Sequence, residues 1–394
     1  MLKKKFNYTR IDNSRLTLVL SIFLTIFYIY QDLAKWPLIS FIKAQGPVTY
    51  VDSSTVLYYA DCFSKIGNEV FAAGNTCANW SYGSGILRFL NLIGVNQGHT
   101  AFFGHFFTYS ILLTFVYFLY LARDFRFTQI TMFVGLISPS VWLLMERGNF
   151  DNLMYLMVFL SAILFRKGFE IIAIIFIFLS AIFKFYTLPL LLIPVLSSKK
   201  MYAKLVAIFA LFLGTAIIFN EFKLINGNII QAGNNHFGMK IIGNYLGKVG
   251  LKLNIVSAYF LGGFLFFICI LLFLFFLRKF EPLLLHRQSF FEPIKSLYIF
   301  MSSTFLLCFV VGLSVDYRLI FYLVSAPFLI TLFNPTLRFI VSGLFLIGAW
   351  FCYPSGIFQT VGDLALEFVA ALGIIILRFS LLPRKCNPNL NRPA

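Results

Sequence analysis

Long apolar runs recur along almost the whole chain, and they constrain its fold more than any other feature. A helix needs about 20 apolar residues to cross the hydrocarbon core of a membrane, so we expect about twelve spans, within a range of about 10 to 13. The expected spans are 16–34, 106–122, 129–145, 152–165, 170–184, 185–197, 203–219, 254–277, 296–314, 319–333, 338–352 and 364–382. Pro189 and Pro194 leave open whether 170–197 is one long span or a broken re-entrant pair.

Composition supports the same class. Hydrophobic residues make up 60% of the chain and charged residues only 12%, whereas a soluble domain carries about 25% charged residues. We therefore predict an all-α polytopic membrane protein, with residues 1–394 forming a single transmembrane domain.

The distribution of basic residues predicts the orientation. With the N-terminus in the cytoplasm, every second loop is rich in Lys and Arg, as the positive-inside rule requires. We expect a multi-pass protein of the cell membrane (inner or plasma) with both termini cytoplasmic. The net charge of +17 then reflects topology and contact with anionic membrane lipids. No nucleic-acid partner is predicted, because no basic soluble domain is present.

Two large loops are predicted on the extracytoplasmic face. The first, 36–105, is expected to contain short helices and the second is 220–253; loops of this length are usually functional. Acidic residues concentrate on this face. The membrane orientation of the protein does not explain this distribution, because Asp and Glu contribute little to orientation. They are Asp52, Asp61, Glu69, Glu146, Asp151, Glu221, Asp316 and Asp363.

The motif Glu-Arg-Gly-Asn at 146–149 directly follows an apolar run. Unpaired charge is costly at the edge of the hydrocarbon, so these side chains should have partners. Asp151 and Asn152 follow as a plausible start of the next helix. The sequence leaves open a simpler arrangement, in which Glu146 and Arg147 satisfy each other.

The positive-inside rule does not explain the positions of two further cations. Lys184 has apolar sequence on both sides, so a functional role is the default reading, for example holding a lipid phosphate. Snorkelling to a helix end remains the alternative. Arg318 begins a span on the outer side, which indicates a phosphate or carboxylate partner; pairing with Asp316 remains the alternative.

Cys62 and Cys77 share the first external loop. In an oxidising compartment they are expected to form a disulfide, contributing about 3 kcal/mol by a chain-entropy estimate. The spacing of the histidines is not a metal-binding motif. No metal site is therefore predicted, and the need for a divalent ion is left open.

The order of these features resembles the GT-C superfamily of polytopic glycosyltransferases, most closely family 87, the polyprenyl-phosphate-mannose-dependent mannosyltransferases. The resemblance covers residues 40–205 best. The matching segments are Asp52 with Tyr58–Ala60 and Gly67–Phe71, Cys77–Tyr82, Glu146–Asn149 with Asp151, Lys184–Tyr186 with Pro189, and Asp316–Leu319. Trp80-Ser81-Tyr82-Gly83 stands where many relatives have Asn-Tyr-Pro-Pro.

The resemblance implies a GT-C-like fold and an extracytoplasmic active site. The enzyme would move a mannose-like hexose from a polyprenyl-phosphate sugar to a glycan or glycolipid acceptor with inversion. Asp52 would be the general base, with Asp61 as the competing candidate. Lys184, Arg147 and Arg318 would bind the donor phosphate. The implied substrate-binding residues are Glu146, Asn149, Asp151, Tyr186, Asp316 and Tyr317, with Trp80 and Tyr82 as candidates for stacking on sugar rings.

Two other functions remain open. A polymerase of O-antigen or exopolysaccharide would also have many spans and a large external loop, but its arginines would be expected in later external loops, where only Arg318 fits. A flippase or transporter of lipid-linked sugar would show internal repeats and discontinuous helices with charge at mid-membrane. Lys184 near Pro189 suits that class, whereas the outward concentration of acids argues against it.

Overall fold

The structure, a computed structural model, describes about two thirds of the chain. The described residues are 13–34, 50–71, 77, 80, 83–225, 236–237, 264, 294–311, 314–315, 319–324, 326–331, 335–351, 361–362 and 365. Four predicted site residues, Tyr82, Asp316, Tyr317 and Arg318, lie outside these ranges. So do nearly all of the spans expected at 254–277 and 364–382 and most of the loop 220–253.

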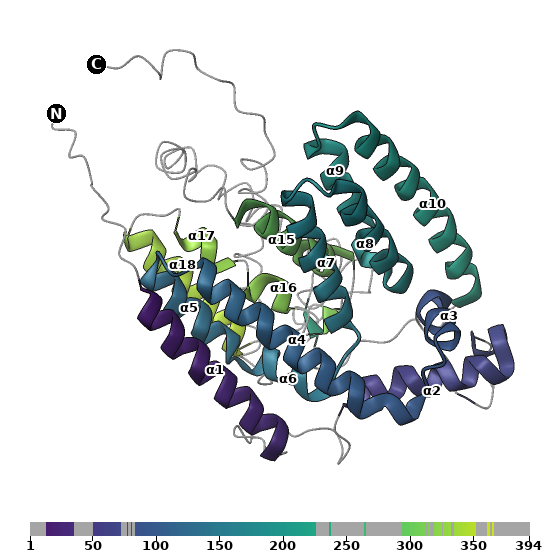
Figure 1. The fold of residues 1–394 in the computed structure, drawn as a ribbon, viewed down its shortest axis with the longest axis horizontal. Coiled ribbons are helices and arrows are strands. Elements are labelled where there is room, and N and C mark those ends of the chain that lie inside the picture. Colours follow the sequence, from purple (N-terminus) through teal and green to yellow (C-terminus); the bar gives the residue numbers. More distant parts are fainter. Residues whose placement is uncertain are drawn as a thin grey trace.

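The described part of the chain is helical (Figure 1). Its first-half elements are α1 (Ser14–Ala34), α2 (Val51–Ile66), η1 (Gly67–Phe71), α3 (Ser84–Leu92), η2 (Gln97–His99), α4 (Thr100–Leu121), α5 (Arg126–Leu136), α6 (Pro139–Arg147), α7 (Asp151–Arg166), α8 (Glu170–Phe183), η3 (Phe185–Leu191), α9 (Leu192–Ser197) and α10 (Met201–Ile225). The later elements are α15 (Lys295–Val311), α16 (Ile320–Leu323), α17 (Ala326–Ile330) and α18 (Pro335–Phe351), with one antiparallel pair, β1 (His236–Phe237) and β2 (Ser314–Val315).

Two of the described helices are long and apolar enough to cross a membrane. They are Gln97–Leu121, which includes η2 and α4, and Met201–Glu221 within α10. A third candidate span arises if α5 and α6 count together, and several shorter apolar helices accompany them. The described part therefore fits an α-helical membrane protein, while the number of about twelve spans stays a prediction.

Three of the expected apolar stretches are not single straight helices in the structure. The stretch 129–145 is not one straight helix, because α5 and α6 meet at a 50° bend; whether the pair crosses as one broken span stays a prediction. The cause of the bend is Pro139, which is the first residue of α6 and cannot continue a preceding helix. The span expected at 319–333 is also replaced by the short helices α16 and α17. For 170–197, the broken alternative holds: α8, η3 and α9 follow one another, with Pro189 inside η3.

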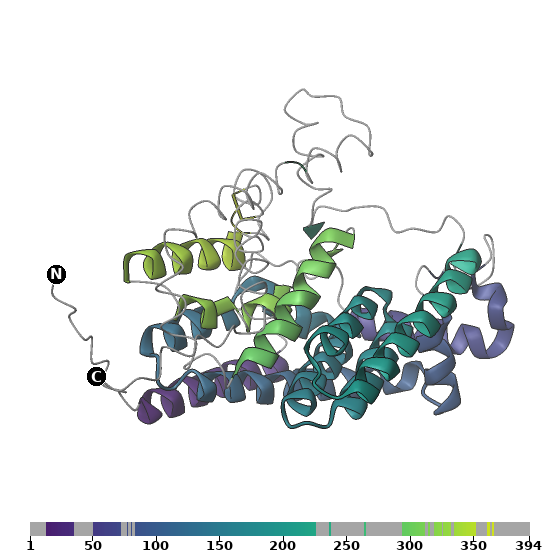
Figure 2. The ribbon, with the colours of Figure 1, turned by 90° about the horizontal axis from the view of Figure 1, so that it is seen from above.

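The helices pack with α1 beside α4, and with α7 between α8 and α15 (Figures 1 and 2). Polar side chains inside this packing bond to one another or to the backbone. Thr114 of α4 and Tyr155 of α7 share a hydrogen bond of 2.7 Å, and the Tyr28 hydroxyl of α1 donates to the Leu136 carbonyl of α5. Such bonds offset the cost of placing polar groups in an apolar interior.

The segment before α4 folds into the short elements α2, η1, α3 and η2, as the sequence predicted for the first large loop. The structure joins Cys62 and Cys77 in a disulfide, with 6.1 Å between the Cα atoms, so this prediction is confirmed. Helix α10 runs along one edge of the molecule from α9 to α3 (Figure 1). There the Glu221 carboxylate accepts hydrogen bonds from the Ser84 backbone N–H at 2.7 Å and from the Ser84 hydroxyl at 2.5 Å.

Candidate functional site

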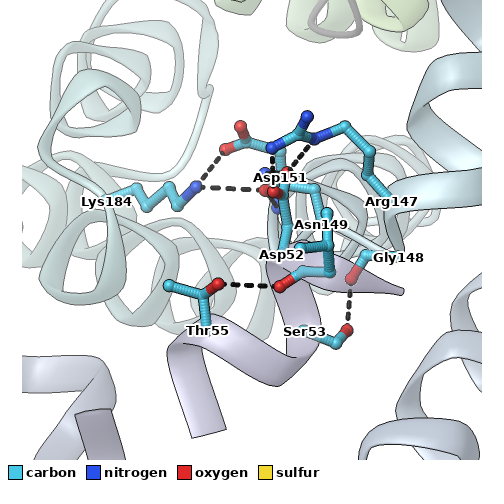
Figure 3. Close-up of polar contacts among 9 residues, drawn as sticks. Asp52, Ser53, Thr55, Arg147, Gly148, Asn149, Asp151 and Lys184 are labelled. Atoms are coloured by element: carbon cyan, nitrogen blue, oxygen red, sulfur yellow. Dashed lines mark hydrogen bonds and ion pairs between the residues drawn. The ribbon is translucent and has the colours of Figure 1, made fainter. Parts of the chain in front are cut away.

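Polar side chains from several separate segments meet beside the first turn of α2 (Figure 3). Helix α2 contributes one carboxylate; the end of α6, the turn after it and the start of α7 contribute three groups; and the junction of α8 and η3 contributes two. We call this set the charge cluster: Asp52, Arg147, Asn149, Asp151, Lys184 and Tyr186. It contains two carboxylates and two cations, so its formal charge is balanced.

The first ion pair of the charge cluster joins Asp52 and Arg147. The Arg147 Nε donates to Asp52 Oδ2 at 2.9 Å, and the second guanidinium nitrogen, Nη2, donates to Oδ1. This two-point contact matches the fork of a guanidinium to the two oxygens of a carboxylate. The side chains are 13% exposed for Asp52 and 30% for Arg147. We call it the open pair, because the Arg147 side chain keeps part of its surface accessible.

The second ion pair joins Lys184 and Asp151, with 2.8 Å between Lys184 Nζ and Asp151 Oδ1. The Tyr186 hydroxyl donates to the same carboxylate oxygen at 2.8 Å. The side chains are only 7% exposed for Lys184 and 1% for Asp151, so we call this the sealed pair. Snorkelling of Lys184 was the alternative prediction, and it is wrong, because the ammonium ends on a buried carboxylate.

Asn149 connects the two ion pairs. Its Nδ2 donates to Asp52 Oδ2 at 2.5 Å, whereas its Oδ1 accepts from Lys184 Nζ at 3.4 Å. The same Oδ1 accepts from the backbone N–H of Asp151 at 2.7 Å, a local side-chain bond that is common for Asn at turns and helix starts. The Asn149 amide therefore bonds the Asp52 carboxylate with its nitrogen and the Lys184 ammonium with its oxygen, and it links both ion pairs in one network.

The backbone of the turn at Gly148 brings Asp52 to the charge cluster. Gly148 has φ +55°, and a Cβ atom there would lie 2.9 Å from the Tyr50 ring and 3.1 Å from Ser53 Oγ. Only glycine fits this turn without strain. The Ser53 hydroxyl donates to the Gly148 carbonyl, and the Tyr50 backbone N–H donates to the Glu146 carbonyl at 2.9 Å. These bonds dock the start of α2 on the end of α6.

Tyr50 and Ser53 belong to this site, although nothing in the sequence predicted them there. Tyr50 adopts a left-handed conformation, φ +60°, which a tyrosine adopts only at a cost of about 1–2 kcal/mol. Its hydroxyl lies 3.1 Å from His105 Nδ1, and its ring occupies the space beside Gly104 that a side chain would need. No periodicity in the sequence reveals such a conformation.

Asn152, one residue beyond Asp151, is fully buried. Neither its amide nitrogen nor its amide oxygen has a hydrogen-bond partner in the described structure. A buried amide without partners destabilises the protein by about 1–3 kcal/mol per group. From the sequence, Asn152 was predicted only at a helix start, with no role in the site.

Glu146 contributes its carbonyl to the docking of α2, and no hydrogen bond or ion pair of its carboxylate is found among the described residues. The predicted alternative, in which Glu146 and Arg147 satisfy each other, gives way to the pairing of Arg147 with Asp52, 95 residues away in the chain. The prediction that these polar side chains need partners is confirmed for Arg147 and Asn149. The role of Glu146 in binding substrate stays a prediction.

The structure separates Asp61 from the charge cluster. Asp61 lies near the other end of α2, where its carboxylate accepts the backbone N–H of Gln97 at 3.1 Å. This contact lies at the first residue of η2 and holds α2 to the segment before α4. The geometry therefore gives Asp61 a surface contact within the first loop, whereas Asp52 belongs to the charge cluster.

Trp80 does not present its ring for stacking on a sugar, so this prediction was wrong for the structure as described. Its exposed fraction is 3%, and its ring packs on Tyr59 with 4.8 Å between the ring centres. The indole N–H donates to the Gly83 carbonyl at 3.1 Å. Trp80 therefore forms part of the packing beside the disulfide.

Among the described ranges, no three His, Cys, Asp or Glu side chains gather in an arrangement that holds a metal ion. The fold and the charge cluster together define the class as an α-helical protein with candidate membrane spans and two linked ion pairs between its helices. Comparisons with protein-family models, with curated proteins and with solved structures found no match to this chain.

Proposed function

We propose that this protein is an integral membrane glycosyltransferase that uses a polyprenyl-phosphate sugar as donor. In this proposal it has the GT-C arrangement, about twelve spans, and an active site on the extracytoplasmic face. It moves a mannose-like hexose to a hydroxyl of a glycan or glycolipid. The observation that supports this most is the convergence of Asp52, Arg147 and Lys184, a carboxylate and two cations from three distant segments.

The open pair supplies the reacting carboxylate and a phosphate-binding group. In the unliganded site both carboxylate oxygens of Asp52 are occupied by donors from Arg147 and Asn149, so they are not available to an acceptor hydroxyl. A guanidinium binds phosphate with the same two-point geometry as carboxylate. Binding of the donor phosphate to Arg147 therefore releases Asp52, which becomes available for the acceptor hydroxyl. The donor itself activates the base in this way.

The proposed reaction is a single inverting displacement. The acceptor oxygen attacks the anomeric carbon and forms the new glycosidic bond, while its proton passes to Asp52. The bond between the anomeric carbon and the phosphate oxygen breaks, and the electron pair leaves with the polyprenyl phosphate. Arg147 stabilises the charge that builds on this leaving phosphate. Arg318, outside the described residues, is proposed as a second phosphate ligand.

Lys184 has a different part in this proposal. Its ammonium bonds Asp151 and Asn149 and is almost fully buried, so it acts as a positioning residue that orients the Asn149 amide toward Asp52. Its positive charge also favours an anion nearby, since electrostatic effects are stronger away from water. Tyr186 supports the same carboxylate and helps to keep the sealed pair in place.

A transfer assay with membranes tests the proposal. Membranes that contain the protein are given an acceptor extract and a panel of labelled polyprenyl-phosphate hexoses, with nucleotide sugars as the comparison. We expect label to move from one lipid-linked sugar, and we expect Asp52→Asn to abolish that transfer at normal protein amount. Asn keeps the shape and one acceptor oxygen for Arg147. Transfer by Asp52→Asn at the wild-type rate would refute the proposed role of Asp52.

A flippase of lipid-linked sugar is the second candidate, because the structure has discontinuous helices at the site. Helix α8 ends at Phe183 directly before Lys184, and η3 and α9 continue from there. Broken helices with charge at the break are typical of transporters. Vesicles that contain the purified protein distinguish the two: a flippase moves a fluorescent lipid-linked sugar between leaflets without acceptor, whereas the proposed enzyme forms a new glycoside.

A further inference from the structure

At the end of the helices far from the charge cluster, two turns lie against each other. The turn between α7 and α8 and the turn between α9 and α10 are tied by two hydrogen bonds. Lys200 Nζ donates to the Gly168 carbonyl at 2.8 Å, and the Ser198 hydroxyl donates to the Glu170 carboxylate. Ser198 Oγ also accepts the Lys200 backbone N–H at 3.0 Å. The two turns therefore form one continuous surface.

This surface is strongly basic. Five cations stand at the end of α7, on the two turns and on the first turn of α10: Arg166, Lys167, Lys199, Lys200 and Lys204. We call them the basic end patch. Glu170, the first residue of α8, is the one carboxylate between Arg166 and Lys204, and it accepts a bond from Ser198. Arg166, Lys167 and Lys199 are exposed, so their charges are available to an anion.

Exposed apolar side chains lie directly beside the basic end patch. Phe169, Leu196, Met201 and Tyr202 are all largely exposed. Aromatic rings and long cationic side chains are typical of the level of the lipid headgroups, where one end of each side chain is apolar and the other is polar.

Helix α10 continues the apolar surface away from the basic end patch. Leu205, Phe209 and Phe212 are exposed at helical spacing on one face. Only 22% of the spanning window of α10 is buried in the protein, which is less than half the value of 50% for the span that contains α4. The described residues therefore leave this face of α10 open to contact with acyl chains along its length.

The combination of these surfaces defines a ligand with an anionic head and long apolar chains. A free phosphate ion would bind to the cations and would not use the neighbouring apolar face. We propose that the basic end patch binds the headgroup of an anionic phospholipid, whose acyl chains lie along the exposed face of α10. The binding is independent of sugar transfer, and it places the lipid at the end of α7 and α8 opposite to Asp151 and Lys184.

The test uses the purified full chain in a neutral detergent, titrated with phosphatidylglycerol, phosphatidylcholine or soluble glycerol phosphate. Native mass spectrometry counts bound lipid, and the thermal midpoint reports stabilisation. We expect phosphatidylglycerol to bind and to raise the midpoint, and the other two ligands to do neither. Equal binding of phosphatidylcholine, or full binding of glycerol phosphate alone, would overturn the proposal.

Two matched double variants locate the site. Lys167→Gln with Lys199→Gln should weaken binding of phosphatidylglycerol about 30-fold, and Lys199→Gln alone about fivefold. The control, Arg123→Gln with Arg126→Gln, removes two cations from the turn between α4 and α5 and should leave binding unchanged. The single variant serves if the double variant does not fold. Equal losses in both double variants, or no loss in Lys199→Gln, would contradict the assignment.

Discussion

The two ion pairs of the charge cluster share Asn149 and differ in their surroundings. The sealed pair, Lys184 with Asp151, has side chains that are 7% and 1% exposed, and Tyr186 completes its carboxylate. The side chains of the open pair are more exposed, 13% for Asp52 and 30% for Arg147. A ligand can therefore approach the open pair, whereas the sealed pair is enclosed by the helices.

This difference indicates a division of roles. Breaking an enclosed ion pair leaves an uncompensated charge, so such a pair holds its helices in a single arrangement. A partly exposed pair loses less when its partners separate, because solvent or a ligand replaces the lost contact. On this account the sealed pair maintains the frame of the site, and the open pair exchanges partners when a phosphate binds.

The largest effect is expected from the sealed pair. Lys184→Met leaves the Asp151 carboxylate buried without its cation, so we expect the free energy of unfolding to fall by about 3–5 kcal/mol. Denaturant unfolding in detergent measures this loss. Adding Asp151→Asn removes the orphaned charge and keeps an acceptor for Tyr186, so the double variant should recover much of the stability. If the double variant were as unstable as Lys184→Met, the two residues would not act as a pair.

Gly148→Ala breaks the docking that brings the open pair together. An alanine in this left-handed conformation costs about 1–2 kcal/mol, and its Cβ would press on Tyr50, as the 2.9 Å approach predicts. We expect a loss of about 2 kcal/mol in the free energy of unfolding, together with weaker transfer. Gly94 also has a positive φ, but a Cβ there meets no atom within 4 Å, so Gly94→Ala is the matched control. Equal losses in both variants would show that backbone strain alone explains the effect.

Arg147→Lys tests the exchange at the open pair. Lysine keeps the charge but loses the two-point geometry, so we expect the KM for the lipid-linked donor to rise about tenfold. The free energy of unfolding should change by less than about 1 kcal/mol, because the pair is partly exposed. Steady-state transfer at varied donor concentration gives the KM. An unchanged KM would remove Arg147 from donor binding.

Asp61→Asn should have the smallest effect. Its carboxylate bonds the backbone N–H of Gln97, and an asparagine oxygen can accept the same bond. We expect the free energy of unfolding to stay within about 0.5 kcal/mol of the wild type, and transfer to stay near the wild-type rate. A loss of transfer comparable to that of Asp52→Asn would move the base to Asp61.

The sequence predicted the helices better than their interruptions. The apolar run that became α10 is one helix of 25 residues, but the run at 129–145 bends at Pro139 because hydropathy alone does not register a missing backbone donor. Pro189 and Pro194 did signal the break that separates α8, η3 and α9. Within a long apolar run, proline is therefore the residue that indicates where a helix ends or bends.

The site was predictable in part, because a charge inside apolar sequence needs a partner. That rule identified Arg147 and Lys184, but it did not identify their carboxylates. Asp52 and Arg147 are 95 residues apart, and no spacing within one helix relates them. The burial of Trp80 and the left-handed Tyr50 depend on packing between segments, which a linear pattern does not encode.

The most direct measurement is the rate of sugar transfer by Asp52→Asn beside Asp61→Asn, in membranes with equal amounts of protein. The account predicts that Asp52→Asn lowers the rate at least about 100-fold, as loss of a general base does, while Asp61→Asn stays near wild type and both variants unfold at the wild-type temperature. Equal rates for the two variants, with both proteins folded, would contradict the assignment of the open pair as the reacting site.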